Sequence, residues 1–344
     1  MGYKMKYRLR HCVWEITLGC CFSCKYCGSG VNGQKRENEL TTEECINVAE
    51  QLKNLGCRRV SLIGGEVFMR KDWDAVVEAL TSRGIVTCII TNGFLFREEH
   101  INRLKELNIE SVAVSLDGPR DVHDKYRQEG SYDRAVRAIE MLTAAGIHVS
   151  VITTLNHENA ARLEDFFEIV KDFNIFAWQL QACSPMGNAA KAGIDFAFDF
   201  AKVIQFVEDH MYSVPFAMGV AHNIGYYTEN DNRVRGVRNG GAPFGGCTAG
   251  LTGIGIDSVG NVRGCESMYD DEFIEGNLRE KTLAEIWDDP DAFAYNRKFK
   301  PELLTGKCST CEMGKYCAGG CRSYNYFVHG KIYESPACAR IKAD

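Results

Sequence analysis

Four cysteines lie within eight positions near the start of the chain, at Cys20, Cys21, Cys24 and Cys27. Thiolates so closely spaced are typical ligands of zinc or of an iron–sulfur cluster. A zinc site needs four closed ligands, usually in two pairs, but Cys21 is squeezed against its neighbour Cys20. The three-thiolate set of Cys20, Cys24 and Cys27 would instead leave one iron of a cubane cluster without a protein ligand, free to bind a chelating substrate.

A second cysteine group occupies the C-terminal part of the chain. Its seven members are Cys247, Cys265, Cys308, Cys311, Cys317, Cys321 and Cys338. Cys308 to Cys321 follow the spacing C-x2-C-x5-C-x3-C. A zinc ribbon is the simplest alternative, but it would use only four of the seven thiolates and has no use for the rest.

The stretch between the two groups alternates between predicted strands and predicted helices. The strands lie within 58–66, 85–93, 109–118, 147–156 and 175–187. Amphipathic helices lie within 72–84, 97–108, 131–146, 160–174 and 195–212. This order predicts parallel βαβ units, an α/β fold in which ligands bind at the carboxyl ends of the strands.

Polar residues stand at the carboxyl ends of the five predicted strands. They are Gly64-Gly65-Glu66, Thr91-Asn92-Gly93, Ser115 to Gly118, Thr153 to Asn156, and Gln179 to Gln181. Any one of these alone would be ordinary turn chemistry. Because all five should face the same rim of the sheet, together they indicate a binding site.

Composition restricts the class of protein. The 344 residues are 45% hydrophobic and carry a net charge of -6, which argues against a nucleic-acid partner held by phosphate contacts. No signal peptide and no run of 18 apolar residues is present, so we expect a cytoplasmic protein without membrane spans. Sixteen cysteines in that reducing compartment are ligands or reactive thiols rather than disulfides.

The N-terminal motif resembles that of the radical SAM superfamily. Cys20, Cys24 and Cys27 match C-x3-C-x2-C, Tyr26 is the aromatic residue common before the last cysteine, and a strand ending in Gly-Gly-Glu follows. The resemblance implies a partial (β/α)6 barrel over residues 10–190. It also implies a [4Fe-4S] cluster whose open iron binds S-adenosylmethionine (SAM), which one electron cleaves to a 5′-deoxyadenosyl radical that abstracts a substrate hydrogen.

The same resemblance implies the cofactor contacts. These are Gly64, Gly65 and Glu66 for the methionine amino group, Ser115 near the ribose and methionyl end, and Arg127 for the carboxylate. The family usually continues Gly-Gly-Glu with proline, where this chain has Val67. That departure loosens the turn but leaves the carboxylate.

The second cysteine group resembles the SPASM extension of radical SAM enzymes, expected over 246–344 after a bridging segment at 191–245. By resemblance, an outer auxiliary [4Fe-4S] cluster is held by Cys308, Cys311, Cys317 and Cys338, and an inner one by Cys247, Cys265 and Cys321. Three clusters in all are expected. Because seven ligands leave one iron short, that iron is either open to substrate or bound by a non-cysteine group.

Six cysteines remain outside these sets. Cys45 and Cys88 lie within a predicted helix and an apolar strand, where a free thiol behaves as a small hydrophobe. Cys183 lies just beyond the last predicted strand, at the barrel mouth. A thiol there could return a hydrogen atom to a substrate radical, although strand-end cysteines are often simply buried.

The resemblance implies that the enzyme modifies a ribosomally made peptide, by a thioether or carbon–carbon crosslink or by epimerisation. The alternatives are a sulfatase-type protein maturase and a sugar or small-molecule oxidase or epimerase. An iron–sulfur electron-transfer protein without catalysis is the alternative from another class. We expect an electron donor such as flavodoxin or ferredoxin. Because the cluster motif begins at Cys20, we also expect a separate leader-binding protein or a substrate without a leader.

Overall fold

One sheet of ten strands runs through the computed structural model, which describes residues 7–225, 233–235 and 244–340. Seven consecutive strands pair in parallel in chain order. They are β1 (His11–Glu15), β2 (Arg59–Ile63), β3 (Val86–Thr91), β4 (Ser111–Ser115), β5 (Val149–Leu155), β6 (Ala177–Ala182) and β7 (Ala217–Val220). Their carboxyl ends therefore meet at one rim.

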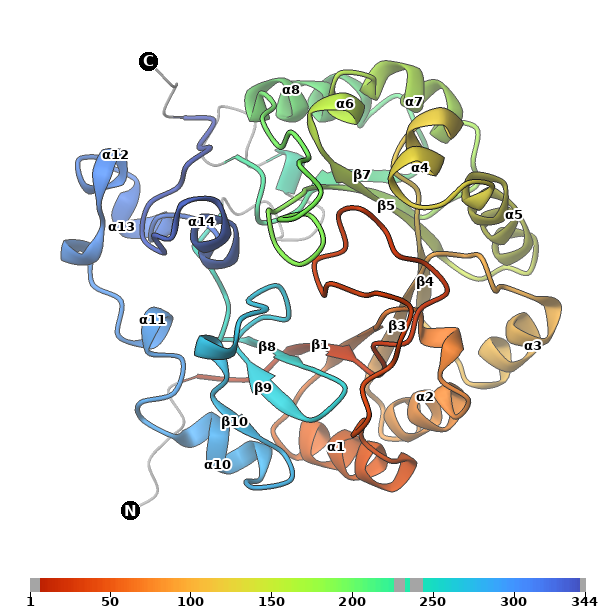
Figure 1. The fold of residues 1–344 in the computed structure, drawn as a ribbon, viewed down its shortest axis with the longest axis horizontal. Coiled ribbons are helices and arrows are strands. Elements are labelled where there is room, and N and C mark those ends of the chain that lie inside the picture. Colours follow the sequence, from red (N-terminus) through yellow and green to blue (C-terminus); the bar gives the residue numbers. More distant parts are fainter. Residues whose placement is uncertain (1–6, 226–232, 236–243, 341–344) are drawn as a thin grey trace.

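Helices follow the strands and cover the outer face of the sheet (Figure 1). The longer ones are α1 (Thr42–Asn54), α2 (Trp73–Thr81), α3 (Glu98–Glu106), α5 (Ser131–Ala144), α7 (Leu163–Val170) and α8 (Phe200–His210). The short helices α4 (Arg120–Tyr126) and α6 (His157–Ala160) and the 3-10 turn η1 (Val67–Met69) follow strand ends. Apolar side chains such as Trp14, Leu62 and Val114 are fully buried between the two layers.

The cysteine-rich C-terminal part continues the same sheet. Its strand β8 (Gly253–Ile256) pairs in parallel with β1, and β9 (Asn261–Arg263) and β10 (Gly276–Asn277) extend the edge in antiparallel fashion. A Cβ atom at Gly253 would collide with the His11 ring, so glycine permits this close pairing.

Short helices and turns follow β9 in the chain and lie beside the barrel (Figure 1). They are η2 (Asp271–Phe273, between β9 and β10), α10 (Leu283–Asp288), α11 (Ala294–Arg297), η3 (Pro301–Leu303), α12 (Gly306–Ser309), α13 (Gly314–Cys317) and α14 (Arg322–His329).

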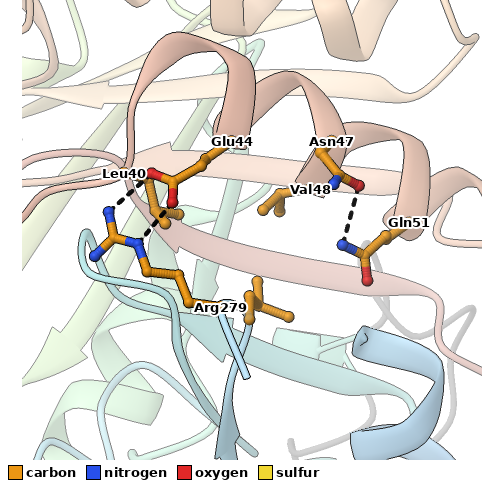
Figure 2. Close-up of a pocket in the computed structure, with 7 residues that line it drawn as sticks. Leu40, Glu44, Asn47, Val48, Gln51 and Arg279 are labelled. Atoms are coloured by element: carbon orange, nitrogen blue, oxygen red, sulfur yellow. Dashed lines mark hydrogen bonds and ion pairs between the residues drawn. The ribbon is translucent and has the colours of Figure 1, made fainter. Parts of the chain in front are cut away.

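Glu44 links the barrel to the C-terminal part at the protein surface. Its carboxylate closes the capping box of α1 with Thr41 and also accepts hydrogen bonds from Arg279, at 2.6 and 2.8 Å. The bonds from Arg279 lower the pKa of Glu44 to about 2. Figure 2 shows this pair at the edge of a pocket of about 420 Å³ between α1 and the segment after β10. The pocket is a crevice between the two parts and contains none of the predicted site residues.

The predicted α/β fold is confirmed, since the five predicted strands are β2 to β6 and the helix expected within 195–212 is α8. The sequence analysis did not predict β1 or β7, which are five and four residues long. Parts of the predicted bridging segment, 226–232 and 236–243, lie outside the described residues. Among the described helices, none has the length and apolar character needed to cross a membrane.

Candidate functional site

The loop between β1 and α1 carries the first cysteine group across the ring of strand ends (Figure 1, red). Cys20 is buried, and Cys24 and Cys27 are half-buried. The pKa of the Cys24 thiol is raised to about 12, mainly by burial; the charge of Arg127 opposes the shift, and the charges of Cys27 and Cys20 contribute to it. The three thiols therefore lie in one apolar cluster and interact electrostatically with one another, and a metal centre bound there would displace their protons.

Gly64 and Gly65 form the surface on which this loop rests. The Gly65 amide donates to the Thr17 carbonyl at 2.8 Å, and the Glu66 amide donates to the Gly19 carbonyl at 2.8 Å. A Cβ atom at Gly64 would collide with the Thr17 carbonyl oxygen, and one at Gly65 would lie 2.7 Å from the Cys20 Cβ. Two glycines are needed here because the cysteine loop passes directly over the end of β2.

A second clamp comes from the segment after β6. The Asn188 side chain donates to the carbonyl oxygens of Cys24, at 3.1 Å, and Val31, at 2.8 Å. The backbone amide of Asn188 donates to the Cys27 carbonyl at 2.9 Å. Gly187 has a φ of 57°, and a Cβ atom there would collide with the Cys27 carbonyl oxygen. The loop that carries the thiols is thus fixed from two sides.

Glu66 is buried at the end of β2, and protein donors occupy much of its carboxylate. The Thr91 hydroxyl donates to it at 2.7 Å, the Asn92 amide at 2.8 Å, and the Phe68 amide at 3.3 Å. Burial raises the pKa of Glu66, although these hydrogen bonds oppose the shift. A carboxylate has about four lone-pair sites, so one remains for a ligand. Glu66 therefore holds β2 and β3 together in addition to the role that the sequence predicts for it.

Arg127 lies at the same rim in a buried ion pair. Its Nε donates to Asp117, which also accepts from the Tyr26 hydroxyl and, at 2.7 Å, from the Thr154 amide. Burial by itself would raise the pKa of Asp117, but the charges of Arg127 and His123 hold it below its ordinary value. No other guanidinium nitrogen of Arg127 donates to a described residue, so its terminal nitrogens remain available for an anion.

Ser115 and Cys183 complete the predicted residues at the rim. Ser115 is half-buried at the last position of β4. Cys183 is buried one residue after β6, in an apolar cluster with Tyr26 and Ala189. Burial raises the pKa of the Cys183 thiol to about 12, and the charge of Asp117 adds to the shift. The thiol is therefore protonated at neutral pH.

The seven C-terminal cysteines separate into two groups. In the first, burial raises the pKa of Cys321 to about 12 and that of Cys265 to about 11, and the charge of Cys247 raises both further. In the second, the pKa of Cys317 is raised to about 11, mainly by burial; a backbone hydrogen bond at Gly319 opposes the shift, and the charges of Cys308, Cys338 and Cys311 add to it. This division has the same membership as the inner and outer ligand sets that the resemblance implied.

The chemistry of the donor sets suits iron–sulfur clusters. No group of three or more His, Cys, Asp or Glu side chains among the described residues is placed to hold one metal ion. Sets of three, three and four thiols, each half-buried or buried among apolar side chains, suit the thiolate ligation of cubane iron–sulfur clusters. The assignment of individual ligands remains a prediction.

Family comparisons identify both parts of the chain. The radical SAM superfamily model matches residues 14–170, and the SPASM model, an iron–sulfur cluster-binding domain, matches residues 247–312. The chain is a radical SAM enzyme with a SPASM domain. Domains of these kinds bind SAM and iron–sulfur clusters.

Two curated relatives match this radical SAM enzyme over most of its length. The AdoMet-dependent heme synthase of Oleidesulfovibrio alaskensis is 27% identical, over 94% of this chain and 86% of the relative. The mycofactocin maturase MftC of Mycobacterium tuberculosis is 27% identical, over 92% of this chain and 78% of the relative.

The fold is shared with a solved structure. Streptococcus suis SuiB bound to SAM superposes with a TM-score of 0.78 at 18% identity, over 96% of this chain and 77% of that chain. SuiB has also been solved with its precursor peptide SuiA, with a TM-score of 0.78, 18% identity, and coverage of 97% and 76%. At this identity the likeness shows a common fold.

Sequence reasoning missed three residues that organise the radical SAM site. Asp117 and Asn92 stand in the polar strand ends, but their roles depend on Arg127 and on the cysteine loop, which only the fold brings to them. The Asn92 side chain donates to the Cys21 thiol at 3.5 Å. Asn188 follows Gly187 after β6, and a Gly-Asn pair in a sequence indicates only a turn.

Proposed function

We propose that this radical SAM enzyme cleaves SAM reductively at the cluster site of Cys20, Cys24 and Cys27 and uses the radical to modify a peptide. The observation that carries the proposal is the cysteine loop clamped over Gly64 and Gly65, with its three thiols in one apolar cluster. A cluster bound there supplies the electron that breaks the sulfur–C5′ bond of SAM. The two C-terminal thiol groups support two further clusters, three in all.

The residues around the loop bind and orient SAM in this proposal. Glu66 accepts a hydrogen bond from the methionine ammonium with the lone pair left by its three protein donors. Arg127 offers its terminal nitrogens to the methionine carboxylate while Asp117 fixes its Nε. Ser115 lies at the neighbouring strand end, near the ribose and methionyl end.

If the modification is an epimerisation, Cys183 would return a hydrogen atom to the substrate radical, and the thiyl radical left on Cys183 would be reduced to the thiol by one electron from the electron donor and one proton. A hydrogen-atom donor must carry its hydrogen, and burial keeps this thiol protonated. Its position one residue beyond β6, in contact with Tyr26 of the cysteine loop, supports a place at the substrate side of the rim.

A peptide substrate is supported by the maturase relative and by the fold shared with SuiB, a protein solved with a precursor peptide. A thioether, a carbon–carbon crosslink or epimerisation are the modifications that we propose, with flavodoxin or ferredoxin as the electron donor. The heme synthase relative, at the same identity, favours a second candidate, a tetrapyrrole substrate.

The test uses the full chain reconstituted anaerobically with iron, sulfide, SAM and dithionite. Wild-type protein is expected to form 5′-deoxyadenosine, and a variant with Cys20, Cys24 and Cys27 replaced by alanine is expected to form none while keeping its other iron. A variant with the buried cysteines Cys45 and Cys88 replaced by alanine is the matched control and should retain activity. Continued 5′-deoxyadenosine formation by the triple variant refutes the assignment of the SAM-binding site.

Substrate class is tested separately. The wild type is incubated with a precursor peptide encoded beside its gene, or with an iron porphyrin that carries propionate groups, and the products are examined by mass spectrometry. A mass change of the peptide, with faster SAM turnover, supports the proposal. A change confined to the porphyrin replaces it with the second candidate.

A further inference from the structure

Arg322 is a fully buried cation that has no carboxylate partner among the described residues. It is the first residue of α14 and follows Cys321 directly. Its Nε donates to the Asn296 side-chain oxygen at 3.0 Å, and its Nη1 donates to the carbonyl oxygens of Ile332, at 2.9 Å, and Ala318. Its Nη2 is buried without a hydrogen-bond partner. Every group that receives a hydrogen bond from it is neutral.

Two arginines at other sites of this protein do pair with a buried carboxylate. Arg263 pairs with the buried carboxylate of Asp257 at 2.9 Å, and Arg127 pairs with Asp117. A buried charge without an opposite charge is strongly unfavourable, so proteins pair such groups or place them beside a metal centre. The position of Arg322 therefore calls for a negative charge that the described carboxylates do not supply.

The backbone places this guanidinium beside a cysteine of each auxiliary group. Arg322 directly follows Cys321, and its Nη1 donates to the carbonyl oxygen of Ala318, the residue after Cys317. Burial lowers the pKa of Arg322, and the negative charges of Cys247, Cys321 and Cys317 oppose that effect. Cys247 and Cys321 belong to the inner group, whereas Cys317 belongs to the outer one. Arg322 thus lies within electrostatic reach of both groups at once.

Aromatic rings keep water away from the charge. The Arg322 guanidinium carbon lies 4.6 Å from the centroid of Tyr333 and 5.2 Å from that of Phe299. Because the surroundings are apolar, the effect of the charge on neighbouring anions is screened less than it would be at the surface.

We propose that Arg322 is the internal counter-charge shared by the two auxiliary clusters, and that it raises the reduction potentials of both. The inference rests on the proposed function, since it requires the two thiol groups to bind clusters. A thiolate-ligated cluster is anionic and becomes more negative on reduction, so a nearby cation stabilises the reduced form. Arg322 is a positioning residue in this role and need not touch the substrate.

The test compares Arg322→Met, which removes the charge, with Arg322→Lys, which keeps it. Both are made in the full chain with Cys20, Cys24 and Cys27 replaced by alanine, so that only auxiliary clusters give signals. Potentials are measured by redox titration monitored by electron paramagnetic resonance, and iron is counted for each variant.

Arg297→Met is the matched control. Like Arg322, Arg297 donates only to neutral groups: the backbone carbonyls of Gly250 at 2.8 Å, Trp287 at 2.7 Å and, at 3.4 Å, Asp289. Its Nη2 is likewise buried without a hydrogen-bond partner. Its electrostatic neighbours are tyrosine and carboxylate side chains rather than thiols. Loss of this arginine removes similar hydrogen bonds without removing a charge from the clusters.

We expect Arg322→Met to lower the equilibrium constant for reduction of each cluster at least about tenfold. For a one-electron couple this is a fall of ~59 mV in the reduction potential. Arg322→Lys should shift the two reduction potentials less, and Arg297→Met should leave them unchanged. If Arg322→Met fails to hold auxiliary iron, retention by Arg322→Lys still supports the charge requirement. Equal iron loss in both variants, or full loading with unshifted potentials, overturns the proposal.

The two proposals fail in different ways. Wild-type protein with iron for a single cluster would refute the auxiliary clusters and Arg322 with them. Wild-type protein with iron for three clusters, together with unshifted potentials, refutes only the role of Arg322.

Discussion

Replacing Asp117 with asparagine tests the centre of the SAM site as the structure describes it. The carboxylate is buried and accepts hydrogen bonds from Arg127, Tyr26 and the Thr154 amide. Asparagine keeps the shape but removes the charge, so the buried guanidinium of Arg127 loses its counter-charge. Arg127 should also turn away from its present orientation, because one amide oxygen cannot satisfy all three donors.

The magnitude follows from the burial of both partners. The side chains of Arg127 and Asp117 are 11% and 1% exposed, and breaking a buried ion pair costs about 3–5 kcal/mol. The exposed pair Arg120–Asp133, at 56% and 63%, is the matched control, and such surface pairs contribute only about 0–1 kcal/mol. Asp117→Asn should therefore destabilise the protein several-fold more than Asp133→Asn.

Denaturant unfolding of the reconstituted proteins under anaerobic conditions measures the stability, and calorimetric titration measures SAM affinity. Because the folded-state pKa of Asp117 is depressed, its contribution is fully present above the unfolded pKa of about 3.9 and is lost as pH falls through the folded value. The difference in free energy of unfolding between wild type and Asp117→Asn should thus be constant near neutral pH and become smaller below about pH 4. Equal destabilisation by the two variants, with unchanged SAM affinity, would show that the reasoning is wrong.

Three further outcomes are expected. Reconstituted wild type should contain about twelve iron and twelve sulfide per chain, and a value near four would remove both auxiliary clusters. In Glu66→Gln the side-chain amide nitrogen must face a donor such as the Asn92 amide, so the free energy of unfolding should fall by about 1–3 kcal/mol. SAM affinity should fall by roughly ten- to hundred-fold. An unchanged SAM affinity would leave Glu66 only its structural role. Cys183→Ala should stall turnover after hydrogen abstraction or alter the product, and full turnover with the normal product contradicts its role as hydrogen-atom donor.

Features set by local spacing were predictable from the sequence. Cysteine spacing identifies both groups, and alternating strand and helix patterns identify β2 to β6, because each signal lies within a few residues of chain. Gly64 and Gly65 were identified by resemblance, but the physical reason for them, the close passage of the loop at Thr17 and Cys20, is visible only in the structure.

Features set by contacts distant in the chain were not predictable. Asp117 reads as a strand-end turn residue until Tyr26 and Arg127 are brought to it from two other segments. The multiple hydrogen bonds to Glu66 and the burial of Arg322 without a carboxylate partner among the described residues are similarly products of packing. No local pattern distinguishes a buried arginine beside Cys321 from an exposed one.

The pairing of β8 with β1 also affects the order in which the chain can fold. During synthesis β1 emerges first, yet the strand that covers one of its edges begins only at Gly253. Until then the ribosome-bound chain presents an open edge beside β1, which can pair with strands of other chains. A chain cut before Gly253 would keep that edge permanently, so we expect the isolated barrel to aggregate. Productive folding should wait for the C-terminal strands, and chaperones that shield the early barrel should raise the yield of the whole protein.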